Sequence, residues 1–284
     1  MVNVSIVGGT HGNEMSGIFL VKKWSYDSKD LERDGLEVST HLGNPRACDD
    51  CVRYLDYDLN RLFSENQIIC DGHEVGLAEK WNTYLSVDVD FVIDLHNTTS
   101  AMGATLILIS SSRFDLMLGA YINEHMPHAN IVIEDHETLS NHGYLASASS
   151  SGVIVEVGAQ PHLVLRQDVT ELMSEMTLHI LDFTSKFYSG DIDCKLKSYN
   201  AFRFLNTVKF PTCAQGIVNA MVHNSVLDSD FSPLNPNDKM FKTFSGDDVL
   251  WDGDEVVYPH FINEAAYMES GIAMALAKKV IINT

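Results

Sequence analysis

Strand-like and helix-like segments alternate along the chain from the N-terminus to about residue 191. Segments rich in β-branched residues lie at residues 3–7, 36–42, 90–95, 104–109, 130–134 and 152–157. Segments with apolar residues at helical spacing lie at residues 14–25, 74–86, 114–125 and 168–188. This alternation is typical of a largely parallel sheet with helices on its faces. The sequence therefore predicts an α/β fold for this part of the chain.

The composition changes from about residue 192 onward. This region is rich in Pro, Asp and Asn and has short strand-like pieces at residues 206–210, 216–222 and 255–258. The length of 284 residues suits about two domains. We predict an α/β domain over residues 1–191 and a smaller β-rich domain over residues 192–284.

The charge balance limits the partners that the protein can bind. The chain has 19 Lys and Arg against 39 Asp and Glu, a formal net charge of −20. Such a chain repels phosphate backbones and anionic lipids, so we expect neither nucleic acid nor a membrane as a partner. No apolar run approaches the ~18 residues of a membrane helix. An anionic substrate would have to be attracted by a local group of arginines.

The cysteines and the N-terminus indicate a cytoplasmic protein. An odd number of thinly spread cysteines and a start without a basic leader segment favour a reducing, intracellular compartment. Cys48 and Cys51 form a C-x-x-C pair, but a zinc ribbon needs a second pair and a redox site needs its own context. We interpret these two as incidental thiols. The five cysteines are Cys48, Cys51, Cys70, Cys194 and Cys213.

A set of possible metal ligands follows two of the predicted strands. His11 and Glu14 lie three residues apart on a glycine-rich turn after the first strand, and His96 follows the strand at 90–95. Catalytic zinc uses three protein N or O ligands, and ligands gather at the carboxyl edge of α/β sheets. A lone histidine after a strand is more often structural, but the joint pattern favours a metal site. Asp94 could orient one imidazole.

Glu156 is a candidate proton carrier for such a site. It lies within Val153-Ile154-Val155-Glu156-Val157, where a charge is unfavourable unless it has a partner. The alternative is a solvent-facing glutamate on an edge strand. The continuous apolar run suits a central strand instead, so we predict that Glu156 takes a proton from the attacking water and passes it to a leaving nitrogen.

Three arginines lie within fifteen positions after the second strand. Arg46, Arg53 and Arg61 start from the same edge of the sheet as the possible metal ligands, and Asn60 precedes Arg61. Each arginine alone could simply pair with a nearby aspartate at the surface. Together they predict an anion site, because arginine binds carboxylates in a bidentate manner.

Six blocks, in order along nearly the whole chain, resemble the aspartoacylase and aminoacylase-3 family of zinc-carboxypeptidase-like amidohydrolases. The blocks are Gly8-Gly9-Thr10-His11-Gly12-Asn13-Glu14, Asn44-Pro45-Arg46-Ala47, Arg53-Tyr54 with Asp58-Leu59-Asn60-Arg61, Asp94-Leu95-His96-Asn97-Thr98-Thr99, Glu156-Val157-Gly158 and Asn263-Glu264-Ala265-Ala266-Tyr267. The resemblance implies a carboxypeptidase-like α/β/α catalytic domain and a β-rich C-terminal domain that narrows the channel to the metal. It suggests a dimer or higher homo-oligomer.

The resemblance also implies roles for individual residues. One Zn²⁺ per chain would bind to His11, Glu14 and His96, and Glu156 would act as general base and acid. Arg53 would polarise the amide carbonyl and stabilise the oxyanion. The substrate's α-carboxylate would lie on Asn60 and Arg61, and Tyr267 would close over the substrate; Arg46 receives no role. The substrate-binding set is Arg53, Asn60, Arg61, Glu156 and Tyr267.

The resemblance implies hydrolysis of N-acyl amino acids, with N-acetyl-L-aspartate as the first expectation. Family members that act on this substrate have an arginine ten positions before the catalytic glutamate, where this chain has Ala146. No arginine lies between Arg113 and Arg166, so a short gap does not supply one. The alternatives are a deacylase of neutral or aromatic N-acyl amino acids, a peptide carboxypeptidase, and a silent zinc- or carboxylate-binding protein.

Overall fold

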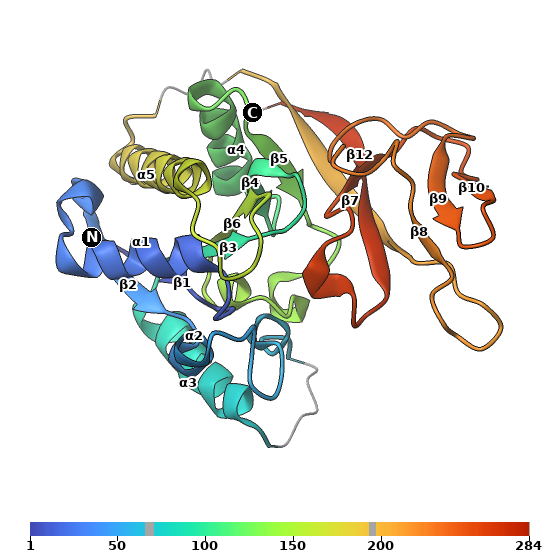
Figure 1. Cartoon of the computed structure of the whole chain (residues 1–284). Coiled ribbons are helices and arrows are strands. Elements are labelled where there is room, and N and C mark those ends of the chain that lie inside the picture. The colour runs from blue at the N-terminus through green and yellow to red at the C-terminus, as the bar shows by residue number, and fades with distance from the viewer. Residues whose placement is uncertain (66–70, 193–196, 284) are drawn as a thin grey trace.

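The computed structural model describes residues 1–65, 71–192 and 197–283. A nine-stranded mixed sheet runs through it in the order β11-β12-β7-β5-β4-β6-β3-β1-β2, and a three-stranded sheet has the order β10-β9-β8 (Figure 1). The strands are β1 (Val2–Gly8), β2 (Leu36–Leu42), β3 (Phe91–Asn97), β4 (Gly103–Leu108), β5 (Asn130–Ile133), β6 (Gly152–Gly158), β7 (Tyr199–Lys209), β8 (Ala220–Val222), β9 (Lys239–Thr243), β10 (Asp248–Leu250), β11 (Tyr258–His260) and β12 (Ile272–Ile282).

Five α-helices and five 3₁₀-helices are found within these described ranges. The α-helices are α1 (Met15–Tyr26), α2 (Pro45–Asp50), α3 (His73–Asp88), α4 (Arg113–His125) and α5 (Gln167–Ser189). The 3₁₀-helices are η1 (Lys29–Leu31), η2 (Leu59–Arg61), η3 (Leu139–Asn141), η4 (Leu145–Ala148) and η5 (Ala265–Tyr267).

Two apolar layers cover the opposite faces of the large sheet. Because side chains alternate along a strand, Val153 and Val155 of β6 pack with α1, α4 and α5, whereas Ile154 packs with α3 and η4. Figure 1 shows α1, α4 and α5 together on one side and α3 away from them. The central strands are therefore buried on both faces, which confirms the predicted α/β/α arrangement and explains their near-continuous apolar sequence.

The large sheet as a whole is mixed, but the prediction of a largely parallel sheet is confirmed for residues 1–191, where β1 pairs in parallel with β2 and β3, β3 with β6, and β4 with β5. Strand β4 runs antiparallel to β6, and β12 runs antiparallel to both β7 and β11. Strands β7, β11 and β12 belong to the C-terminal region but extend the same large sheet, whereas β8 to β10 form the small sheet at the far end of Figure 1. Local sequence patterns reveal strands but not their partners.

Three adjacent parallel strands bring the predicted ligands together. Strand β3 lies between β1 and β6, with Gly8 opposite Leu95 and His96 opposite Glu156. His96 lies within β3 rather than after it, because the strand continues two residues beyond the predicted end. The side chains of directly opposed residues in parallel strands point to the same face, so this register places the Glu156 carboxyl beside the His96 imidazole.

The predictions about membrane helices and about the cysteines can also be compared with the structure. Among the residues that it describes, no helix combines the length and apolar character needed to cross a membrane. Cys48, Cys51 and Cys213 are free thiols. Cys70 and Cys194 lie outside the described residues.

Candidate metal centre and substrate cavity

The turn after β1 has a shape that only small residues allow. Gly9 has a φ of +74°, and a Cβ on Gly12 would lie 2.0 Å from the backbone carbon of Ala47 in α2. The backbone N–H of Gly12 donates to the carbonyl of Arg53 at 3.2 Å. The turn is thus packed directly against the segment that carries the arginines, and it directs His11 and Glu14 toward β3.

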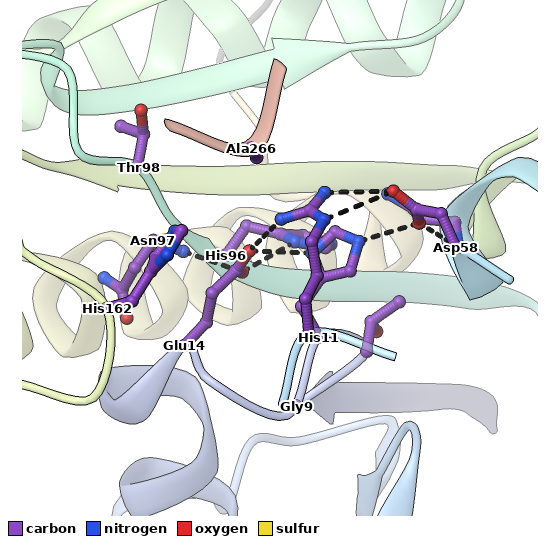
Figure 2. Close-up of polar contacts among 12 residues, drawn as sticks. Gly9, His11, Glu14, Asp58, His96, Asn97, Thr98, His162 and Ala266 are labelled. Carbon is purple, nitrogen blue, oxygen red and sulfur yellow. Dashed lines mark hydrogen bonds and ion pairs between the residues drawn. The ribbon is translucent and has the colours of Figure 1, made fainter. Parts of the chain in front are cut away.

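His11, Glu14 and His96 form a compact, buried group. One ligand atom from each lies within 4.8 Å of the other two, and each residue is 3% exposed. His11 Nδ1 lies 2.7 Å from Glu14 Oε1, and His96 Nδ1 lies 3.0 Å from Glu14 Oε2. Figure 2 shows the Glu14 carboxylate reaching both imidazoles. Two imidazole nitrogens and a carboxylate match the donor set of a zinc site, so these residues fit a metal ion.

Each imidazole is also held from its other nitrogen by a second carboxylate. His96 Nε2 lies 2.8 Å from Asp94 Oδ2, as the sequence suggested. His11 Nε2 lies 2.9 Å from Asp58 Oδ1, a contact that the sequence did not reveal (Figure 2). Such carboxylate–histidine pairs fix the ring orientation and leave the inner Nδ1 atom for a metal.

The charges of the group support one another. Burial alone would raise the pKa of Glu14, but His11 and His96 hold it well below its usual value. Burial alone would lower the pKa of His96, but Asp94 and Glu14 hold it well above its usual value. The backbone N–H of Asn97 also donates to Glu14 Oε2 at 3.0 Å. Glu14 is therefore an ionised acceptor surrounded by donors.

Arg53 reaches the same group from the segment after α2. Its guanidinium donates to Glu14 Oε1 at 3.1 Å and, through its other nitrogens, to Asp58 Oδ2 at 3.1 and 3.3 Å. The buried carboxylate of Glu74 accepts three backbone N–H groups at residues 55–57 and so fixes the path of the chain between Arg53 and Asp58. The arginine is therefore held rigidly at the edge of the possible metal site.

Glu156 lies in the interior beside this group. It is 7% exposed in a central strand, so the alternative of a solvent-facing edge residue was wrong. Burial raises its pKa well above the usual value, His96 and Arg53 oppose this shift, and Glu14 adds to it. A carboxyl with a raised pKa beside possible metal ligands binds a proton more readily than an ordinary carboxyl, which suits a group that transfers protons.

Asn60 and Arg61 also line the cavity. Asn60 Oδ1 accepts the backbone N–H of Leu145 at 2.7 Å, and the Arg61 guanidinium carbon lies 5.4 Å from the centre of the Tyr144 ring. Arg53 and Arg61 both line the cavity, but Arg46 is exposed on α2 and does not. The predicted cluster of three arginines is thus a pair.

Tyr267 enters the cavity from the C-terminal region. The preceding Glu264 carboxylate accepts hydrogen bonds from Thr98, Thr99 and Ser100, the residues that follow β3, and from the backbone N–H of Ala266 at 3.0 Å. This buried carboxylate ties the turn at η5 to the strand that carries His96. The contacts of Glu264 with Thr98, Thr99 and Ser100 could not be assigned from the sequence, because these partners lie more than 160 positions away.

Two connected hollows complete the site. An inner cavity of about 50 Å³ has the possible metal ligands, Glu156, Asn60 and Tyr267 in its lining. An outer vestibule of about 760 Å³ shares Arg53, Arg61, Glu134, Tyr144, Phe261, Ala266 and Tyr267 with it. Ala146 is fully buried and lines neither hollow. The site is a narrow pocket that opens to solvent through a wider entrance.

The fold and this cluster define an α/β protein with a buried His-Glu-His group that could hold a metal ion at the end of a substrate-sized channel. Residues 1–184 match the model of the succinylglutamate desuccinylase/aspartoacylase catalytic domain, and residues 197–279 match that of the AstE/AspA barrel-sandwich hybrid domain. The chain belongs to the succinylglutamate desuccinylase/aspartoacylase family. The predicted boundary between residues 191 and 192 lies between the two matched segments and stays a prediction.

Individual relatives cover almost the whole chain. It is 40% identical to the aspartoacylase of Danio rerio over 292 residues, 98% of this chain and 92% of that protein. It is 37% identical to the N-acyl-aromatic-L-amino acid amidohydrolase (carboxylate-forming) of Rattus norvegicus, over 100% and 92%. The crystal structure of murine aminoacylase 3 superimposes with a TM-score of 0.91 at 36% identity, over 99% and 96%. These matches confirm the family resemblance and the fold class.

Proposed function

We propose that this protein is a zinc-dependent amidohydrolase that releases a carboxylate and a free amino acid from N-acyl amino acids. The proposal rests on one observation, the convergence of His11, Glu14 and His96. Beside this group, Glu156 lies opposite His96 in the neighbouring strand, and Arg53 donates a hydrogen bond to Glu14. A metal-ligand set, a carboxyl with a raised pKa and a fixed cation are the groups that amide hydrolysis needs. The names of the relatives support the same reaction.

A zinc ion held by His11, Glu14 and His96 would supply a Lewis acid for the amide carbonyl and a source of nucleophilic water. Glu156 takes a proton from the attacking water and delivers it to the nitrogen as the C–N bond breaks. Arg53 donates to the developing oxyanion; loss of such a donor raises the barrier by about 3 kcal/mol. Asn60 and Arg61 bind the α-carboxylate, and Tyr267 covers the substrate. These roles are proposals that rest on the positions of the side chains.

The substrate side chain has two candidates. N-acetyl-L-aspartate follows from the aspartoacylase relatives. A neutral or aromatic side chain is favoured by the vestibule, whose wall includes Tyr144, Phe204, Phe261 and Tyr267. Within the described parts of the chain, its Arg and Lys residues are limited to Arg53 and Arg61. A rate comparison across N-acetyl-aspartate, N-acetyl-glutamate, N-acetyl-phenylalanine and N-acetyl-tyrosine distinguishes the two.

The proposed reaction is tested with Glu156→Ala. This variant should bind zinc as the wild type does but lose turnover by several orders of magnitude, because the proton carrier is gone. Zinc content is measured by metal analysis of the purified protein. Retained turnover would refute the role of Glu156. A zinc-loaded wild type that hydrolyses no N-acyl amino acid would instead indicate a silent binding protein. A cytoplasmic location and a homo-oligomeric state stay predictions.

A further inference from the structure

A buried carboxyl in the substrate cavity has no role in the proposed reaction. Glu134 follows β5, is 6% exposed, and lines both the inner cavity and the vestibule. Its backbone N–H donates to the carbonyl of Leu108 at 2.8 Å, which continues the ladder between β5 and β4. The backbone of Glu134 is therefore fixed to the central sheet, and its buried side chain lines the site.

Glu134 holds a phenol in place. Its Oε2 accepts the hydrogen bond of the Tyr144 hydroxyl at 2.9 Å. The His142 ring also stacks on the Tyr144 ring, with 5.3 Å between the ring centres and 22° between the planes. Burial raises the pKa of Glu134, with the Tyr144 hydrogen bond and the charges of His136 and Arg61 opposing the shift. The tyrosine thus has one fixed orientation.

The fixed ring in turn lies against Arg61. The guanidinium carbon is 5.4 Å from the centre of the Tyr144 ring, within the range of a cation–π contact. The residue after Tyr144 holds the residue before Arg61, because the Leu145 N–H donates to Asn60 Oδ1. The carbonyl of Gly143 accepts the N–H of Phe63 at 3.3 Å. Residues 60–63 and residues 143–145 therefore contact each other at several points. Glu134 connects the second of these segments to β5 through Tyr144.

From this chain of contacts, which rests on the proposed function, we infer that Glu134 is a positioning residue for the substrate carboxylate: through Tyr144 it sets the plane of the Arg61 guanidinium. Bidentate recognition of a carboxylate by arginine depends on that plane. Among the described residues, the hydrogen bonds of Glu134 reach Tyr144 and Leu108 and none of the possible metal ligands. Its loss should therefore weaken substrate binding and leave the chemical step nearly unchanged.

The test compares Glu134→Leu, Glu134→Gln and Tyr144→Phe in the full-length, zinc-loaded protein. Glu134→Leu and Tyr144→Phe should each raise KM about tenfold or more, with kcat within about threefold of wild type. Glu134→Gln retains an amide oxygen that accepts the phenol, so its KM should stay within about threefold. The double variant Glu134→Leu/Tyr144→Phe should be no worse than either single one, because both break the same link.

A second readout does not depend on turnover. The product amino acid, titrated into the zinc-loaded protein by calorimetry, should bind about tenfold more weakly to Glu134→Leu and nearly normally to Glu134→Gln. Asp115→Asn is the matched control, since Asp115 is a buried carboxyl that accepts hydrogen bonds from Ser110 and Ser112 away from the cavity. It should lower the melting temperature without changing KM.

Three outcomes would overturn the inference. The first is a Glu134→Leu variant that folds and retains the wild-type KM. The second is a Glu134→Gln variant as weak as Glu134→Leu, which would mean that the charge matters rather than the link to Tyr144. The third is a fall in kcat as large as the rise in KM. If the wild type hydrolyses no N-acyl amino acid, the proposed function fails instead, and the calorimetric comparison still tests Glu134.

Discussion

Replacing Asp58 with Asn should damage two parts of the site at once. Asp58 Oδ1 lies 2.9 Å from His11 Nε2, and Oδ2 accepts two guanidinium nitrogens of Arg53. Asparagine has the same size, but it has no charge and presents an NH₂ group in place of one of these two oxygens. Either His11 or Arg53 therefore loses its acceptor, and we predict both weaker zinc binding and slower turnover.

The size of each effect follows from these contacts. Loss of an outer carboxylate on a metal-binding histidine typically lowers metal affinity about 10- to 100-fold, or about 1.4 to 2.7 kcal/mol. Complete loss of an oxyanion donor raises the barrier by about 3 to 4 kcal/mol. Arg53 still has its hydrogen bond to Glu14, so it should be only partly displaced. We expect kcat to fall about tenfold even at saturating zinc.

Asp94→Asn is the matched control. Asp94 holds His96 Nε2 at 2.8 Å and Thr10 Oγ1 at 2.7 Å, but has no hydrogen bond to Arg53. It should lose zinc affinity to a similar extent and recover its kcat when zinc is in excess. Affinity is measured by competition with a chromophoric chelator, and kcat on the preferred N-acyl amino acid. Full recovery of kcat in Asp58→Asn at saturating zinc would refute the proposed link between Asp58 and Arg53.

Three more predictions concern the second region, pH and the metal. Glu264→Gln should raise KM and lower the melting temperature, because its carboxylate ties η5 and Tyr267 to the residues after β3; an unchanged KM contradicts this. His260 is fully buried, and desolvation lowers its pKa to about 4. The unfolded chain binds the proton more tightly, so stability falls as the pH falls from 6.5 toward 4, by about 2 kcal/mol between pH 7 and pH 5. In urea titrations, His260→Leu should lack this component. Chelation should abolish turnover, and zinc at 100 times its Kd should raise the unfolding free energy by about 2.7 kcal/mol; metal-independent turnover would contradict the proposal.

The sequence predicted those site residues that lie in the last part of a strand or shortly after it. His11, Glu14, His96 and Glu156 lie at or near the ends of β1, β3 and β6, and parallel neighbours bring such positions to one edge of a sheet. Once the strands were recognised, the local sequence pattern was therefore enough to predict that these side chains lie at the same edge of the sheet. The bounds of the predicted helices and strands in the α/β region agree with the structure to within a few residues.

The supporting residues could not be predicted in the same way. Asp58 lies in the irregular segment between α2 and α3, and its contact with His11 depends on how Glu74 holds the backbone before it. Glu264 acts on residues 98–100 across the join between the two regions. Long-range pairing also decided that β7 and β12 extend the central sheet. None of these contacts leaves a periodic signal in the sequence.

The distribution of charge argues for a substrate with one carboxylate. The chain has a net charge of −20, and among the residues that the structure describes, Arg53 and Arg61 are the two Arg or Lys side chains that line the hollows. Arg53 donates to Glu14 and Asp58, and the charge of Arg61 interacts with Asp58 and Glu134, so carboxylates of the chain already lie near both cations. A second carboxylate would meet the carboxyls of Glu134, Glu137 and Glu269 at the vestibule wall, and like charges in a confined site disfavour binding strongly. The buried His142 offers no compensation, because desolvation lowers its pKa. N-acetyl-phenylalanine should therefore be hydrolysed with a higher kcat/KM than N-acetyl-aspartate, and the reverse order would show that a cation outside this wall reads the side chain.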